Sequence, residues 1–190
     1  MIVQRVLAGL LLAGLAPLIA PLTIAVRVSL GSPVLFRQER AGFNGQAFTM
    51  IKLRSMTDGR DRSGALLSDD ERVTRFGRFL RRSRLDELPG LYNIARGDMV
   101  FVGPRPLLPQ TIAALGEPGR RRGSVRPGLT GWAQVNGNTL LTLDEKVALD
   151  LWYVRHAGLR LDAEIAARTL WVMIGGEKLR RTDAVSSARP

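Results

Sequence analysis

An uncharged run of apolar residues constrains this chain more than any other feature of its sequence. No charged residue occurs between Arg5 and Arg27, and residues 6–26 are mostly Leu, Ala, Ile and Val. A straight helix of this length reaches about 31 Å, which is enough to cross the hydrocarbon core of a bilayer. The run is long for a signal peptide, and no convincing small-residue cleavage site ends it before Arg27. The run therefore predicts a membrane segment rather than a signal peptide.

Two prolines, Pro17 and Pro21, lie inside this run. Each removes a backbone N–H and disfavours a straight helix. Basic residues flank the run, with Arg5 before it and Arg27 after it, and positive charge favours the cytoplasmic side of a membrane. A bent segment that enters and leaves one leaflet satisfies both observations. A spanning helix kinked at proline is equally compatible with the residues alone.

The balance of charge favours an anionic partner. Lysine and arginine total 28 against 17 acidic residues, which gives a net charge of +11. Such an excess is typical of proteins that bind nucleic acid, anionic membrane surfaces or phosphorylated substrates. Aromatic residues make up only 6% of the chain, which is low for stacking on single-stranded bases. Together with the apolar run, this favours a membrane over nucleic acid.

The inventory of metal ligands is narrow. The chain has no cysteine, and His156 is its single histidine. A zinc site and a histidine-based triad are therefore disfavoured. Any metal is expected to be an oxygen-bound cation such as Mg²⁺.

The residues after the apolar run predict an α+β fold that is mostly helical. Strands over 34–38 and 48–54, joined by a Gly- and Asn-containing turn, predict a small β-hairpin with Lys52 and Arg54 on one face. Helices are expected over 70–82, 85–96, 140–157 and 161–174, the last two amphipathic. The stretch 100–137 is rich in Gly and Pro and predicts irregular binding loops. Trp152, Tyr153 and Trp171 suit a membrane interface, and core packing is an equal alternative.

Two adjacent acidic residues, Asp86 and Glu87, are the strongest candidates for chemistry. Pro89 is tolerated only near the start of a helix, so both residues are expected at the exposed N-terminus of helix 85–96. A carboxylate there often does no more than cap the helix. Here arginines crowd the pair and should keep both carboxylates ionised. One carboxylate could then attack phosphorus while its neighbour holds Mg²⁺.

Prolines on both sides of Arg105 stiffen the backbone around this residue. A guanidinium fork held in this way suits bidentate recognition of phosphate. Arg126, which precedes Pro127, repeats the device less strongly.

Four segments resemble the signature of the bacterial sugar transferases, the monotopic phosphoglycosyl transferases. They are Ser32–Gly42 (SPVLFRQERAG), Ile51–Met56 (IKLRSM), Arg81–Pro109 (RRSRLDELPGLYNIARGDMVFVGPRPLLP) and Arg126–Gly137 (RPGLTGWAQVNG). Their order and spacing extend the resemblance over nearly the whole chain. The resemblance implies a re-entrant membrane helix bent at Pro17 over residues 1–30 and a continuous catalytic domain over 31–181 with interfacial helices. A disordered tail is expected over 182–190. The length resembles minimal members that carry only these parts.

The resemblance also implies a reaction. Asp86 matches the nucleophile that takes a sugar phosphate from a UDP-sugar, releases UMP and passes the group to polyprenol (undecaprenyl) phosphate. This is the first membrane step in assembling a glycoconjugate such as an exopolysaccharide. Glu87, together with Asp86, matches the Mg²⁺ site. The basic residues that match substrate-binding positions are Lys52, Arg81, Arg105 and Arg126.

The expected location is the bacterial inner membrane, with the catalytic domain on the cytoplasmic face. The expected partners are the UDP-sugar, polyprenol phosphate and membrane phospholipids, with a homodimer left open and nucleic acid not expected. Two alternatives remain at this stage. One is a direct single-step transferase in which Asp86 only binds metal. The other is a basic membrane or nucleic-acid binding protein without catalysis.

The chain departs from the family pattern at three positions. The family often has serine where this chain has Ala16, so a hydroxyl that would help the bend at Pro17 is missing. It often has an acid where this chain has Ala8, which questions an anchoring contact of Arg5. Serine is also usual where this chain has Arg84, and Ser83 is the alternative cap for the following helix.

Overall fold

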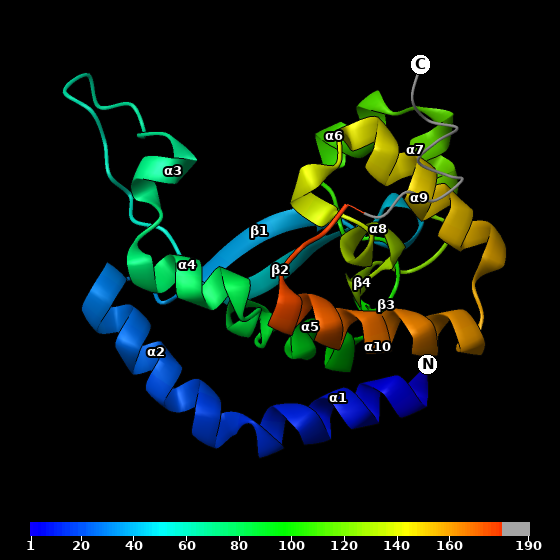
Figure 1. Cartoon of the computed structure of the whole chain (residues 1–190), viewed down its shortest axis with the longest axis horizontal. Helices are drawn as coiled ribbons and strands as arrows, with labels where there is room; N and C mark the ends of the chain where they lie inside the picture. Colours follow the sequence, from blue (N-terminus) through cyan, green and yellow to red (C-terminus); the bar gives the residue numbers. More distant parts are fainter. Residues whose placement is uncertain (180–190) are drawn as a thin grey trace.

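The computed structural model describes residues 1–179, and the tail expected over 182–190 lies outside them. Two helices at the start of the chain form a bent arc along one border of the molecule, and a β-hairpin crosses its middle (Figure 1). The helices over 109–122 and 143–156 lie on the opposite side of the hairpin from the bend, whereas the last helix, over 159–175, runs on the same side as the first (Figure 1).

The apolar run forms two helices, α1 (Ile2–Gly14) and α2 (Ala16–Leu30), and the chain direction bends by 63° between them. Pro17 lies in the first turn of α2, where its missing N–H would have no intrahelical partner. The Leu15 carbonyl accepts the backbone N–H groups of Leu18 (3.0 Å) and Ile19 (2.9 Å), so the bend forms without a hydroxyl at Ala16. Within residues 1–179, no single helix is long and apolar enough to cross a bilayer. The bent pair together meets that test of length and composition.

Both ends of the helix pair pack on the rest of the protein. Near the start of α1, Arg5 Nε donates a hydrogen bond to the Ala95 carbonyl (3.0 Å), and Ala8 is fully buried against α5 (Gly90–Arg96). At the end of α2, Val26 and Leu30 are buried in a second cluster. An acid at position 8 would enter an apolar interface, which explains why Ala8 fits here. The anchoring contact of Arg5 is made without it.

The expected hairpin is confirmed. Strand β1 (Leu35–Ala41) pairs antiparallel with β2 (Ala47–Leu53), and the turn between them contains the 3₁₀ segment Phe43–Gly45. Although Lys52 and Arg54 were expected on one face, the Arg54 guanidinium is not free to bind a ligand, because it is buried and bonded inside the protein. It donates to the carbonyls of Met56 (2.8 Å) and Ser32 (2.9 Å) and pairs with Asp58 (2.6 Å).

The helix expected over 70–82 is two helices, α3 (Asp69–Arg72) and α4 (Arg75–Arg82). The break follows from Thr74, whose hydroxyl accepts the Gly77 N–H (3.0 Å) and caps a new helix. Gly77 is required there, since a Cβ would lie 1.9 Å from the Ser55 carbonyl oxygen. This close approach holds α4 against the end of β2.

The helix expected over 85–96 is also divided. Residues Leu85–Glu87 form a 3₁₀ turn, and α5 begins only at Gly90. Pro89 has no N–H to offer the Leu85 carbonyl, which Leu88 contacts instead with a 3₁₀ spacing (3.4 Å). Asp86 and Glu87 therefore precede α5 by a turn rather than forming its exposed N-terminus.

The Gly- and Pro-rich stretch is more ordered than expected. Strands β3 (Val100–Val102) and β4 (Gly128–Thr130) pair in parallel, and α6 (Pro109–Ala114), α7 (Glu117–Arg122) and α8 (Trp132–Val135) are short helices. Elements this short leave no periodicity in the sequence. The two strands approach closely, since a Cβ on Gly128 would lie 2.1 Å from the Gly103 nitrogen. This contact fixes the start of the loop that carries Arg105.

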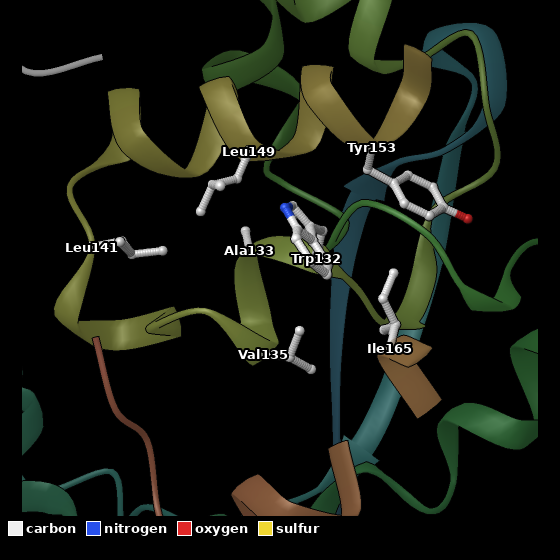
Figure 2. Packing of buried hydrophobic residues seen from close by; sticks show 7 residues of the cluster. All are labelled: Trp132, Ala133, Val135, Leu141, Leu149, Tyr153 and Ile165. Atoms are coloured by element: carbon white, nitrogen blue, oxygen red, sulfur yellow. The ribbon is translucent and has the colours of Figure 1, made fainter. Parts of the chain in front are cut away.

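The last two helices are α9 (Leu143–His156) and α10 (Leu159–Gly175), with a 3₁₀ turn over Asn138–Leu140 before them. Figure 2 shows Tyr153 and Leu149 of α9 and Ile165 of α10 around Trp132. Tyr153 is buried, and Trp152 stacks on Trp132 with ring centroids 5.0 Å apart. Core packing is thus the role of these two aromatics. Trp171 differs, because it is 72% exposed.

Candidate active site

A polar cleft of about 400 Å³ lies between β2, the 3₁₀ turn Leu85–Glu87, the loop after β3, α8 and α9. We call it the polar cleft. It brings together five of the six predicted catalytic and substrate-binding residues, with Arg126 the exception. Its lining is Lys52, Arg81, Arg84, Asp86, Glu87, Arg105, Leu107, Arg122, Ala133, Gln134, Asn138, Thr139, Lys146, Asp150 and Glu177.

The two adjacent carboxylates have different surroundings. Glu87 accepts a hydrogen bond from Arg105 Nη2 (2.7 Å), and its Oε1 lies 3.5 Å from Arg84 Nη1. Asp86 is only 5% exposed, and within residues 1–179 its carboxylate has no hydrogen bond and no ion pair. Arg84 adopts a left-handed backbone (φ 58°) that turns the chain between α4 and the pair. One carboxylate is thus held by arginines, and its neighbour is left open to the cleft.

These surroundings separate the pKa values of the pair. Burial first, and the charge of Glu87 second, raise the pKa of Asp86 to about 6, although Lys52 and Arg105 oppose the rise. Burial also acts on Glu87, but the Arg105 guanidinium holds the pKa of that carboxyl below its ordinary value. The expectation that both carboxylates are exposed is wrong for Asp86, because this side chain is buried and burial raises its pKa. Neighbouring acids whose pKa values are driven apart are a common arrangement in active sites.

A buried ion pair holds the Arg105 loop. Arg122 Nε donates to Asp150 Oδ2 (2.8 Å), and Arg122 Nη2 donates to the Arg105 carbonyl. The Arg122 and Asp150 side chains are only 5% and 3% exposed. The second oxygen of Asp150 is buried and has no hydrogen-bond partner within residues 1–179. The pair thus fixes the backbone of Arg105 from α7 and α9.

The other predicted basic residues are placed as follows. Lys52 lines the cleft from β2, where burial lowers its pKa. Arg81 lines it from the end of α4, and its Nε donates to Ser55 Oγ (2.9 Å). Arg126 lies elsewhere: its Nε donates to the Gly97 carbonyl (3.1 Å), and its guanidinium stacks on the Phe43 ring at 4.8 Å. Ser83 does not cap the next turn, because its hydroxyl donates to the Phe79 carbonyl (2.8 Å).

Two acidic residues that line the polar cleft, Glu177 and Asp150, were not predicted from the sequence. Glu177, just after α10, pairs with Arg84 (3.0 Å) and accepts the Thr139 N–H (3.2 Å) as well as the Asn138 amide. Asp150 was also missed, although an acid between the apolar residues Leu149 and Leu151 was an available signal. Nothing in the sequence near Glu177 marks its contact with residues so far away along the chain.

The acidic pair is compatible with Mg²⁺. Within residues 1–179, no group of three or more acidic or histidine side chains could hold a metal by itself. Mg²⁺ is usually held by one or two carboxylates together with substrate phosphates. The open Asp86 carboxylate beside Glu87 fits that pattern of ligands.

The fold joins a bent apolar helix pair to a cleft in which basic residues surround the adjacent acids Asp86 and Glu87. The model of the bacterial sugar transferase family matches residues 1–176, and the chain belongs to this family. It is 44% identical over 168 residues to the sugar transferase EpsL of Bacillus subtilis, covering 88% of this chain and 83% of that one. The family assignment makes the chain an enzyme, so the alternative of a non-catalytic basic binding protein is wrong.

Two further relatives are longer proteins. The undecaprenyl-phosphate glucose phosphotransferase of Komagataeibacter xylinus is 45% identical over 175 residues, covering 85% of this chain. The UDP-glucose:undecaprenyl-phosphate glucose-1-phosphate transferase of Xanthomonas campestris is 41% identical over 183 residues, covering 90% of this chain. The match spans only 33% and 38% of the lengths of these two proteins.

Proposed function

We propose that this chain transfers a sugar 1-phosphate from a UDP-sugar to polyprenyl phosphate, such as undecaprenyl phosphate. The names of the relatives support this reaction class. The observation that carries the proposal is the asymmetry of the acidic pair. Asp86 is buried, unpaired within residues 1–179 and open to the polar cleft, whereas Glu87 is held by Arg105 and Arg84. A buried carboxylate without partners is costly, and such groups are retained where they react.

In the first step, an Asp86 carboxylate oxygen attacks the phosphorus that carries the sugar. The new oxygen–phosphorus bond forms as the bond from that phosphorus to the bridging oxygen breaks, and UMP leaves with the bridging oxygen. An oxygen of polyprenyl phosphate then attacks the same phosphorus. The aspartyl–phosphorus bond breaks, Asp86 is restored, and a polyprenyl diphosphate sugar is the product.

The other residues of the cleft position and neutralise phosphate. Arg105 has its backbone carbonyl hydrogen-bonded by Arg122, and its guanidinium is fixed beside the carboxylate pair by Glu87. Lys52 and Arg81 add positive charge from β2 and α4. Glu87, together with Asp86, would hold Mg²⁺, which neutralises charge on the transferring and leaving phosphates when bound. With a pKa of about 6, Asp86 is about 90% ionised at neutral pH and therefore competent to attack.

The helix pair supports a location of this chemistry at a membrane surface. Each helix alone is about 20 Å long, shorter than the roughly 30 Å hydrocarbon core. Ala8 in α1 and Val26 in α2 both pack on the same body, which also carries the polar cleft. This packing supports a re-entrant segment, with both ends of the pair on one side of the membrane. Arg5 and Arg27 favour the cytoplasmic face of the bacterial inner membrane as that side.

A direct mechanism, in which the lipid attacks the nucleotide sugar and Asp86 only binds metal, is the alternative. The two mechanisms predict different results when no acceptor lipid is present. Purified protein in lipid nanodiscs is given Mg²⁺ and each of several UDP-sugars without polyprenyl phosphate, and released UMP is measured. We expect one donor to give a single burst, with the mass of a sugar phosphate on the peptide that contains Asp86.

The control is Asp70→Asn, the same substitution at an exposed acid on α3. It should keep the burst, while Asp86→Asn should lose both burst and adduct. Release of UMP only when polyprenyl phosphate is present, with no adduct, would favour direct transfer. No turnover with any UDP-sugar and acceptor would refute the proposed reaction.

A further inference from the structure

A second cavity adjoins the polar cleft. Its volume is about 270 Å³, and we call it the apolar cavity. Its walls come from the 3₁₀ turn and α5 (Leu88, Leu91), from β3 and β4 (Phe101, Leu129) and from α10 (Val172, Met173). The catalytic scheme above makes no use of this space.

The apolar cavity and the polar cleft share three wall residues, Arg84, Glu87 and Gln134. Gln134 Nε2 donates to the Leu129 carbonyl (3.0 Å), while its Oε1 is buried and unpartnered within residues 1–179. A molecule that filled both spaces would have an apolar body against Leu88 and Met173 and a charged end among the guanidinium groups beside Asp86.

The other side of the apolar cavity faces the membrane helices. Leu91 and Phe101 belong to the cluster that buries Ala8 of α1, and Gln4 Oε1 accepts the Phe101 backbone N–H (3.2 Å). Figure 1 shows α10 along the same border of the molecule as α1. Beyond the cavity, α10 exposes Leu170, Trp171 and Ile174. These residues suit contact with lipid.

We propose that the apolar cavity binds the isoprene units of the acceptor lipid next to its phosphate, which guides that phosphate to Asp86. The inference rests on the proposed function and assigns its acceptor a binding site. An apolar cavity of about 150 Å³ holds a benzene molecule, so about 270 Å³ accommodates roughly two five-carbon isoprene units. The apolar wall and the cationic end match the two parts of a polyprenyl phosphate.

Two adjacent alanines on α10 give a matched test. Ala166 lines the apolar cavity, whereas Ala167 does not, and both are exposed to solvent. Ala166→Trp fills part of the cavity, and Ala167→Trp makes the same substitution on the same helix. Steady-state transfer is measured in nanodiscs with undecaprenyl phosphate and the active UDP-sugar, each varied in turn.

Each methylene group excluded from an apolar site costs about fourfold in affinity, so displacing two raises the acceptor KM about tenfold or more. We expect Ala166→Trp to show this rise with an unchanged KM for the UDP-sugar, which also reports an intact polar cleft. Ala167→Trp should change neither constant. Geranyl phosphate, with two isoprene units, should be an acceptor for wild type in detergent and a much poorer one for Ala166→Trp.

An unchanged acceptor KM in Ala166→Trp would overturn the inference. So would a variant that binds phospholipid vesicles less well but uses geranyl phosphate normally, since the cavity would then hold a phospholipid chain. If Ala166→Trp does not fold, Ala166→Leu provides the same comparison with a smaller side chain. Failure of the proposed function looks different, because wild type itself would then transfer nothing from any UDP-sugar.

Discussion

Replacing Asp86 with asparagine should stabilise the fold at neutral pH while abolishing transfer. Asp86 is almost completely buried and has no hydrogen bond or ion pair within residues 1–179. Ionising it therefore costs free energy that an uncharged amide of the same shape does not. Active sites commonly sacrifice stability in this way.

The magnitude follows from the pKa of Asp86, which is about 6 in the folded protein against an ordinary value of 3.8. One pH unit corresponds to about 1.4 kcal/mol, so the ionised carboxylate destabilises the fold by up to about 3 kcal/mol. The folded state binds this proton more tightly than the unfolded state does. The penalty is therefore absent below about pH 4, grows as the pH rises to about 6 and is constant above that.

The assay is thermal unfolding in detergent micelles with a metal chelator and without donor, at about pH 4 and about pH 7.5. A stabilisation of this size raises the Tm of Asp86→Asn by up to about 6–12 °C at the higher pH. Little difference should remain at the lower pH, and Asp70→Asn should follow wild type at both. The reasoning is refuted if Asp86→Asn melts no higher than wild type at about pH 7.5, or if its advantage is as large at about pH 4.

Three other outcomes are expected. Arg105→Lys keeps the positive charge but loses the planar guanidinium that binds Glu87, so kcat/KM should fall about 100-fold or more. Wild-type kinetics in this variant would show that Arg105 does not act in the site. Glu87→Gln should need more Mg²⁺ for half-maximal activity, and excess Mg²⁺ should partly restore its activity. No Mg²⁺ concentration should restore the activity of Asp86→Asn. Equal metal dependence in Glu87→Gln and wild type would argue against Glu87 as a Mg²⁺ ligand. Single cysteines placed before Arg5 and after Arg27 should react with an impermeant thiol reagent from the same side of the membrane, and labelling from opposite sides would contradict a re-entrant segment.

Periodicity and turn chemistry predicted the larger elements. The hairpin, α9, α10 and the break near Pro17 are all marked by local residues, whose effect does not depend on distant contacts. The division of the helix expected over 70–82 depends on Gly77 packing against Ser55, a contact between distant segments. Strands of three residues, such as β3 and β4, carry too little pattern to be detected and exist because Gly103 and Gly128 let two loops approach.

In the candidate site, too, some residues could be predicted from local sequence, whereas their surroundings could not. Asp86, Glu87 and Arg105 have local signals: adjacent acids before a proline, and an arginine between prolines. Their environments could not be read locally, because the burial of Asp86 and the support of Arg105 by Arg122 depend on how α7 and α9 fold back over the cleft. Arg126 shows that a local signal can also mislead. Like Arg105 it lies next to a proline, yet it is outside the polar cleft, with its guanidinium stacked on Phe43.

The burial of Ala8 against α5 bears on how the enzyme is made. Helices α1 and α2 leave the ribosome before the elements of the polar cleft, yet they supply part of the interior on which those elements pack. A chain that misses the bilayer would have to complete this interior with two helices whose outer faces are apolar, including Val3, Leu10 and Ile24. Such a chain would be prone to aggregation and degradation. Under the proposed function, this dependence would confine active enzyme to the membrane that carries its lipid acceptor.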